Sequence, residues 1–403
     1  MRWPILALVA LIATLSSCQE KLTAPADCPA LCPGGQPVVY DEVFTPIPGA
    51  DSSFRGYVQP HQAAAVLVSN GLFGFEERTL IRFGRRQDSV SVRDTLRAYT
   101  IDSVAFNLTL STRDTTLPGL QVLLYRIPAA IDSTVTFAGT APAFAPESLI
   151  ATIPVPDTLK RGPLRVVFQG ADLSRVQIAP SDSGQLALGV RIASPAPTGV
   201  RLGALASGTP ALFTTYVTAD IPDTGTAKLR TLALGPAFNT WVSEAPVVDD
   251  STLLAVGGAP SARSLLRFSL PARIRDSATI VRATLELTAV APLTGLPTIP
   301  DTMAARALLA DVGAKSPVNS TAGRVPVDTL GVGATTVRFE VVRLVELWLG
   351  NTTRPSALML SMTPSLEAAS FSRPGFYSSR AADPAVRPRL HISYLLSFPF
   401  ETP

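Results

Sequence analysis

The sequence predicts an all-β protein whose main part is two tandem antiparallel β-sandwiches. Three observations predict it: a composition rich in strand-forming residues, a period-two alternation of apolar and polar residues, and five sequence blocks that occur twice. The chain has 403 residues, of which 46% are hydrophobic and 16% charged, so it can bury large cores. Its 36 Pro and 27 Gly residues separate short runs of Val, Ile, Thr, Leu and Ser, which is typical of many short strands joined by turns.

Residues 1–17 have the pattern of an export signal. Arg2 gives a basic start, and the apolar run at 5–15 is shorter than the ~20 residues that a membrane-spanning helix needs. The run ends in Leu15-Ser16-Ser17-Cys18, which resembles the lipobox of bacterial lipoproteins. The resemblance implies that the mature chain begins at Cys18 and that its thiol carries diacylglycerol. The lipid membrane is therefore an expected partner.

Gln19, rather than Asp, follows Cys18. By resemblance to the sorting rule of such lipoproteins, this favours the outer membrane or the cell surface. The alternative is an ordinary cleaved signal with a chance cysteine at its end.

Residues 18–37 form a predicted tether rich in Pro and Gly. Cys28 and Cys32 lie in it, and in an oxidising exported compartment they favour a small disulfide. A metal site is the alternative, but two cysteines with no nearby histidine do not complete a tetrahedral set of ligands.

The five repeated blocks define two copies of one domain. Residues 77–83 match 262–268, 101–110 match 279–288, 155–168 match 327–341, 185–192 match 356–362, and 211–217 match 389–395. The repeat predicts a diverged first sandwich at 38–220 and a second at 236–398. Between them, Pro222, Asp223 and Gly225 predict a linker at 221–235.

Within the blocks, apolar residues alternate with polar ones, as Val104, Phe106 and Leu108 do around Asn107 and Thr109. This period predicts half-buried strands whose apolar faces pack between two sheets. One segment differs. At 341–350 the apolar residues recur at helical spacing before a glycine, which predicts a short helix over one end of the second sandwich.

The second copy resembles the DNRLRE domains of bacterial cell-surface and secreted proteins. The matching residues are an arginine-containing strand at 263–268, the segment 342–349, and a closing block at 376–380 and 387–394, within a resemblance that covers most of 238–396. The first copy shares only the arginine strand and the β pattern. The resemblance implies jelly-roll-like sandwiches, and some members of that wider group are carbohydrate-binding modules.

No catalytic machinery is expected. His61 and His391 are the two histidines of the chain, and His391 alternates with apolar residues in a predicted strand. No Gly-Xaa-Ser-Xaa-Gly elbow occurs. The net charge is only +3 with dispersed arginines, so no nucleic acid partner is expected either.

Two candidate binding sites follow from the residue types. Trp241, Phe376 and Tyr377 are aromatic rings that could stack on sugar rings, although aromatic residues more often lie in a core. Asp249 and Asp250 could hold a structural calcium ion together with backbone carbonyls, since calcium accepts mixed oxygen ligands. The alternative for the two aspartates is a solvated turn, and no other cofactor is expected.

The sequence therefore predicts a non-catalytic surface lipoprotein that binds extracellular or envelope polysaccharide. The alternative is a structural or assembly lipoprotein that contacts protein partners in the envelope. An exposed apolar patch without a groove would favour the alternative.

Overall fold

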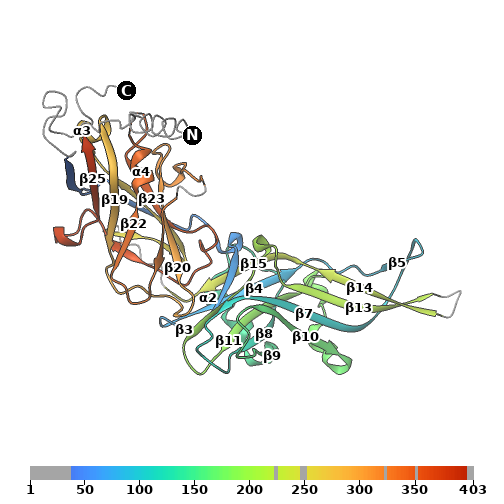
Figure 1. Cartoon of the computed structure of the whole chain (residues 1–403). Helices are drawn as coiled ribbons and strands as arrows, with labels where there is room; N and C mark the ends of the chain where they lie inside the picture. The colour runs from blue at the N-terminus through green and yellow to red at the C-terminus, as the bar shows by residue number, and fades with distance from the viewer. Residues whose placement is uncertain (1–37, 222–225, 246–251, 322–324, 350–352, 397–403) are drawn as a thin grey trace, which may run out of the picture.

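The computed structural model describes residues 38–221, 226–245, 252–321, 325–349 and 353–396 (Figure 1). The predicted signal, the tether with Cys18, Cys28 and Cys32, and the pair Asp249 and Asp250 lie outside these residues. Strands make up 49% of the structure and helices 12%, in several antiparallel sheets. The prediction of a mostly β, antiparallel protein is confirmed.

The first body is one 11-stranded antiparallel sheet that curls into a half-barrel. Its main path runs β14-β13-β7-β12-β3-β4-β11-β8-β9, with β10 on β7 and β15 on β4. The bounds are β3 (Ala65–Leu72), β4 (Phe75–Phe83), β7 (Thr100–Arg113), β8 (Gln121–Ile127), β9 (Leu149–Pro154), β10 (Gly162–Gln169), β11 (Ala187–Ala193), β12 (Thr198–Gly203), β13 (Leu212–Ile221), β14 (Thr226–Leu234) and β15 (Pro236–Ser243).

The curled sheet encloses an aromatic centre. The rings of Phe83, Phe106 and Phe213 are fully buried, with centroids 5.1 to 5.8 Å apart. Phe106 belongs to the alternating block that predicted a half-buried strand. Its neighbours Val104 and Leu108 are buried with it, so the predicted inward face of this strand is confirmed.

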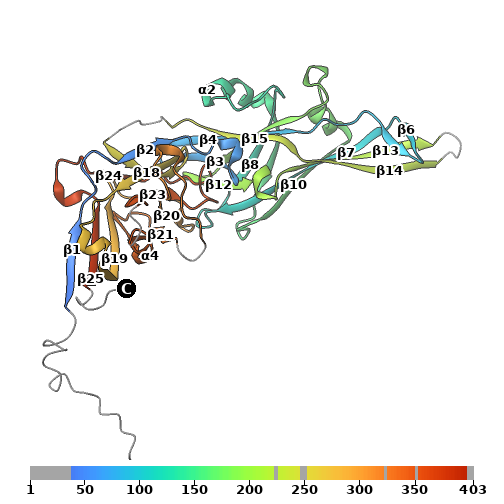
Figure 2. The same cartoon turned by 90° about the horizontal axis from the view of Figure 1, so that it is seen from above.

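A long arm extends from the first body. The hairpin of β13 and β14 projects beyond the sheet, together with one end of β7 and the small hairpin of β5 (Val90–Val92) and β6 (Thr95–Arg97), as Figures 1 and 2 show. The predicted linker at 221–235 is therefore wrong, because β14 pairs along its whole length with β13. The turn residues at 222–225 fall between two paired strands.

The second body contains a four-stranded sheet, β1-β25-β19-β22, and a six-stranded sheet with the path β17-β18-β23-β20-β21 and β2 on β18. A short pair, β16 and β24, lies beside them. The bounds are β1 (Val39–Phe44), β2 (Ser52–Arg55), β16 (Leu253–Ala255), β17 (Gly257–Gly258), β18 (Ser261–Arg267), β19 (Ala278–Thr288), β20 (Asp301–Ala307), β21 (Val327–Leu330), β22 (Thr336–Glu340), β23 (Ala357–Met362), β24 (Gly375–Tyr377) and β25 (Arg389–Leu396).

The repeated blocks take corresponding places in the two bodies. Strand β7 lies between β10 and β13, and β19 lies between β22 and β25. In the same way β11 lies between β4 and β8, and β23 lies between β18 and β20. The matched sequence blocks therefore form matched strands.

The strands that precede each repeat are exchanged between the bodies. Strands β1 and β2 come before the first body in sequence but pair with β25 and β18 of the second. Strands β14 and β15 come before most of the second body but pair with β13 and β4 of the first. In Figure 1 the blue β1 accordingly lies beside the red β25. The pairing corrects the predicted boundaries at 38–220 and 236–398.

A seam of buried contacts joins the two bodies. Phe371, from the loop before β24, is buried in the core of the first body, where its ring packs against Gly199 of β12. Trp241 of β15 donates a hydrogen bond from Nε1 to the carbonyl oxygen of Ala368, at 2.8 Å. Because apolar side chains and hydrogen bonds cross it, the seam is continuous with the core.

The predicted helix at 341–350 is present in a shorter form. Helix α4 spans Val342–Glu346, and the residues at helical spacing, Leu344, Val345 and Trp348, are buried in the core of the second body. Among the described residues, every helix is too short or too polar to cross a lipid bilayer.

Candidate functional site

The outward face of the four-stranded sheet in the second body is a lattice of polar side chains. Successive residues of a strand point to opposite faces, so the inward face of β25 places Leu390, Ile392 and Tyr394 in the core. His391 and Ser393 alternate with them and point outward. The same alternation along β1, β19 and β22 completes the polar face.

Strand register arranges these side chains in three rows across the sheet, about 7 Å apart along the strands. The first row is Asp41, Ser393 and Arg282; the second is Val43, His391, Thr284 and Glu340; the third is Arg389, Glu286 and Arg338. We call these ten residues, all polar except Val43, the polar face.

Ion pairs connect the polar face from strand to strand. Arg338 donates from Nε to Glu286 at 2.8 Å, and Arg389 lies 3.3 Å from the same carboxylate. Arg282 donates to Glu340 at 3.0 Å, and this hydrogen bond raises the pKa of the arginine above its ordinary value. These pairs orient guanidinium and carboxylate groups toward solvent at fixed spacing.

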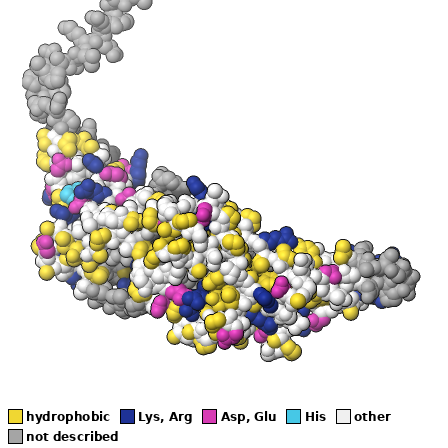
Figure 3. All heavy atoms as spheres, turned by 90° about the horizontal axis from the view of Figure 1, so that it is seen from below, with side chains coloured by type: hydrophobic (Ala, Val, Ile, Leu, Met, Phe, Trp, Pro, Cys, Tyr) yellow, Lys and Arg dark blue, Asp and Glu magenta, His cyan; other side chains and the backbone are white. Residues whose placement is uncertain are grey.

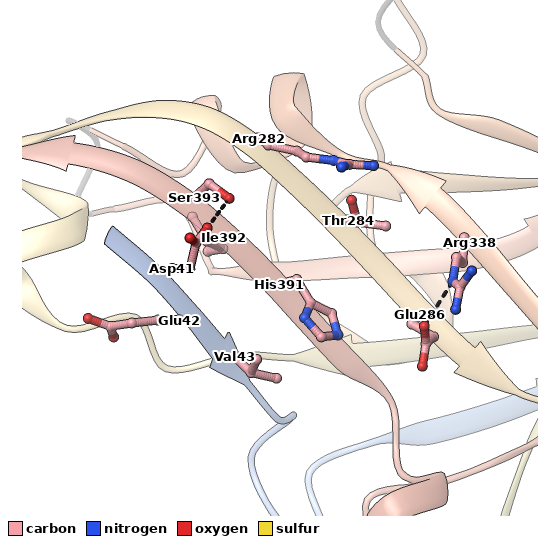
Figure 4. A pocket seen from close by; sticks show the side chains of 10 residues that line it. All are labelled: Asp41, Glu42, Val43, Arg282, Thr284, Glu286, Arg338, His391, Ile392 and Ser393. Carbon is pink, nitrogen blue, oxygen red and sulfur yellow. Dashed lines mark hydrogen bonds and ion pairs between the residues drawn. The ribbon is translucent and has the colours of Figure 1, made fainter. Parts of the chain in front are cut away.

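The polar face is hollowed by a shallow cavity of about 430 Å³. Figure 4 shows Arg282, Thr284, His391 and Arg338 around it, from three neighbouring strands. Figure 3 shows basic and acidic side chains interspersed on one surface of the molecule. A surface of this kind presents several donors and acceptors at once, which suits ligands that carry many hydroxyl groups.

Serine, histidine and aspartate all line this cavity, but their geometry is not that of a catalytic triad. The hydroxyl of Ser393 donates to Asp41 in its own row. His391 lies in the next row, about 7 Å along the strand, which is beyond the reach that a general base needs to activate a serine. The side chain of His391 forms no hydrogen bond with any residue that the structure describes. These three side chains therefore do not form a serine–histidine–aspartate triad.

Strand β1 is held at the edge of this sheet by a cluster on its inner side. The hydroxyl of Tyr394 donates to Glu42 at 2.6 Å, and Arg273 donates to the same carboxylate at 2.7 and 2.8 Å. These hydrogen bonds, first from Arg273 and then from Tyr394, lower the pKa of Glu42. The ring of Tyr40 stacks on that of Tyr394, with centroids 5.6 Å apart.

The aromatic residues proposed from the sequence do not form a stacking surface. Trp241 is only 4% exposed because it fills the seam between the bodies, and Phe376 is fully buried in the second core. The prediction that these two rings contact a ligand is wrong. Tyr377 is partly exposed on β24, opposite Leu253, and His61 stacks against Phe238.

Sequence reasoning missed the polar face, although part of the signal was present. Polar residues at every second position, Arg282, Thr284 and Glu286, mark the outward face of a strand. That Asp41, from the other end of the chain, completes this face depends on the exchanged strand β1. No local pattern predicts such long-range pairing.

Within the described part of the chain, no group of three His, Cys, Asp or Glu side chains gathers into a candidate metal site. Calcium binding by Asp249 and Asp250 stays a prediction, because both lie outside that part. No family model matches the chain, and no curated protein matches it.

Proposed function

We propose that this chain is a non-catalytic, membrane-anchored surface lipoprotein that binds extracellular or envelope polysaccharide through the polar face. In this proposal the two bodies are jelly-roll-like sandwiches, related to the DNRLRE domains that the sequence resembles. Cys18 supplies the lipid anchor, and the second body presents its outer sheet to the ligand.

The observation that carries the proposal is the fixed lattice of hydrogen-bonding side chains. Its arginines and carboxylates are already oriented by ion pairs such as Arg338 with Glu286, so little side-chain freedom is lost when hydroxyl groups bind. The first body supplies a contrast. At the place of Arg338 it has Arg165, opposite Asn107 rather than a glutamate. The corresponding face there lacks the ion-pair lattice among its described residues.

The test is binding of the chain from residue 19 onward to a panel of immobilised polysaccharides, with and without calcium. We expect saturable binding that is lost in a variant carrying His391→Ala and Arg338→Ala. The matched control is Arg165→Ala, which removes the corresponding arginine of the first body. Equal loss of binding in the control, or no binding by the parent chain, would contradict the proposal.

A second candidate function is supported by the arm. Leu229 on β14 is 75% exposed and Leu96 on β6 is 73% exposed, and β14 ends the sheet with no further strand among the described residues. Exposed leucines beside an unpaired strand edge suit contact with a protein. The alternative is therefore an assembly lipoprotein that contacts envelope proteins through the arm.

The two candidates are separated by variants of the arm. Leu229→Asp with Leu96→Asp places charges on this surface and leaves the polar face unchanged. If the arm is the functional surface, crosslinking to an envelope protein in intact cells disappears in this double variant and persists in the variant of His391 and Arg338. The polysaccharide proposal predicts that glycan binding persists in the arm variant and is lost in the variant of His391 and Arg338.

A further inference from the structure

A second cavity, of about 400 Å³, lies where the two bodies meet. Its walls come from the end of β7, from the turn before β10, and from residues 298–300 of the second body. Its polar side chains are cationic or hydroxylic, Ile299 and Pro300 add apolar surface, and no carboxylate belongs to its lining. The cationic and threonine side chains of the lining are Thr112, Arg113, Thr115, Lys160, Arg161 and Thr298.

Arg113 is a buried cation in this wall. It is 2% exposed, and its guanidinium donates to the carbonyl oxygens of Asp114, Leu117 and Pro156 at 3.2, 3.0 and 3.4 Å. No carboxylate in the described part of the chain forms an ion pair with it. Neutral carbonyls orient the guanidinium without forming an ion pair with it, and a buried cation of this kind attracts an anion.

Two more cations stand at the rim. Lys160 and Arg161 are exposed, and neither forms an ion pair with another described residue. The carboxylates adjacent in sequence make their hydrogen bonds elsewhere: Asp114 accepts at Oδ1 from Thr116 and Thr298 at 2.7 to 3.1 Å, and Asp157 accepts at Oδ1 from the backbone of Gly119 at 2.9 Å.

Hydroxyl groups complete the donor set. Thr112 and Thr115 add hydroxyl groups to the lining, and the hydroxyl of Thr112 has no hydrogen-bond partner among the described residues. Thr298 also lines the cavity, but its hydroxyl donates to Asp114. Arginine, lysine and hydroxyl groups converging on one hollow are the donors that recognise carboxylate, phosphate and sulfate groups.

We propose that this cavity binds a small oxyanion, with Lys160 and Arg161 as the contacting cations and Arg113 as the buried charge behind them. The anion has two possible sources, an acidic sugar of a polysaccharide or inorganic phosphate. The sugar source rests on the proposed function and would make the ligand an acidic glycan. The anion site itself does not depend on the polar face, because the two cavities share no residue.

The experiment is calorimetric titration of the chain from residue 19 onward with D-glucuronate, with inorganic phosphate, and with D-glucose as the neutral control. We expect saturable binding of at least one anion, none of glucose, and weaker binding as salt is added. In the double variant Lys160→Ser, Arg161→Ser the affinity should fall roughly tenfold or more, because charge-assisted hydrogen bonds are the strong ones. The matched control Arg85→Ser, Arg86→Ser removes the same charge from another loop.

The titration results distinguish the two possible sources of the anion. Binding of glucuronate supports an acidic glycan as ligand, whereas binding of phosphate alone supports the site with phosphate as its occupant. No anion binding, or the same loss in both double variants, would overturn the proposal. Because Lys160 and Arg161 are exposed, misfolding is not expected, and the variant Lys160→Arg, Arg161→Lys should restore affinity. Glycan binding that is lost only in the variant of His391 and Arg338 would support the proposed function. The titration with the variants of Lys160 and Arg161 decides independently whether the anion site exists.

Discussion

Arg201 of β12 and Asp301 of β20 form a buried ion pair across the seam between the two bodies. The hydroxyls of Ser370 and Ser372 donate to the second oxygen of the same carboxylate. The pair therefore joins strands from both bodies and the loop that carries Phe371. A charge buried at such a junction is tolerated only while its partners stay in place.

Replacing Asp301 with Ala should destabilise the whole protein. The change leaves Arg201 buried without its partner, which costs about 3–5 kcal/mol of the free energy of unfolding. Chemical denaturation measures it. Arg282→Ala is the control, because it breaks an ion pair on the exposed polar face, where solvent screening leaves such pairs little effect on stability. If the two variants lose the same free energy of unfolding, the ion pair between Arg201 and Asp301 is not shielded from solvent.

The seam also predicts the effect of one methyl group. A Cβ atom at Gly199 would lie 2.7 and 2.8 Å from two ring carbons of Phe371, so Gly199→Ala should cost about 1–3 kcal/mol through overpacking. Gly235→Ala is the control, since a Cβ there meets nothing within 4 Å. Adding Phe371→Leu to Gly199→Ala should recover part of the loss. If both glycine variants unfold at the same denaturant concentration, the close approach is incorrect.

The sequence predicted the local features of this fold better than the long-range ones. Alternation of apolar residues correctly placed Phe106 and Leu108 on the buried face of a strand, because period two is a property of each strand alone. Pro222, Asp223 and Gly225 predict a linker as readily as a hairpin turn, since the same residue types end a domain or turn a hairpin. From the sequence alone Trp241 is a candidate ligand contact, because no local pattern shows that a loop from the other body covers its ring.

The exchanged strands predict that the two bodies do not complete their sheets independently. Deleting residues 38–55 removes β1 and β2, which leaves edges of β25 and β18 unpaired. Hydrogen exchange followed by mass spectrometry should then show faster exchange in β25 and β18, while β13 and β4 keep their protection because β14 and β15 still cover them. Faster hydrogen exchange confined to β13 and β4 would contradict the pairing of β1 with β25 and of β2 with β18.

Docking of β1 should also depend on pH through Glu42. Its pKa in the folded protein is lowered from 4.5, first by the hydrogen bond from Arg273 and then by that from Tyr394. A carboxyl group whose folded pKa is lower than its unfolded pKa stabilises the fold fully above the unfolded value, and the stabilisation is lost as pH falls through the folded value. Protection of the β1 and β25 amides from exchange should therefore decrease below about pH 4.5, after correction for the intrinsic exchange rate. Glu42→Gln cannot titrate, so it should have weaker protection above this pH and a flatter dependence below it. If the parent chain and Glu42→Gln lose protection in parallel as the pH falls, another group controls the docking of β1, and the Tyr394 and Arg273 contacts do not hold this strand.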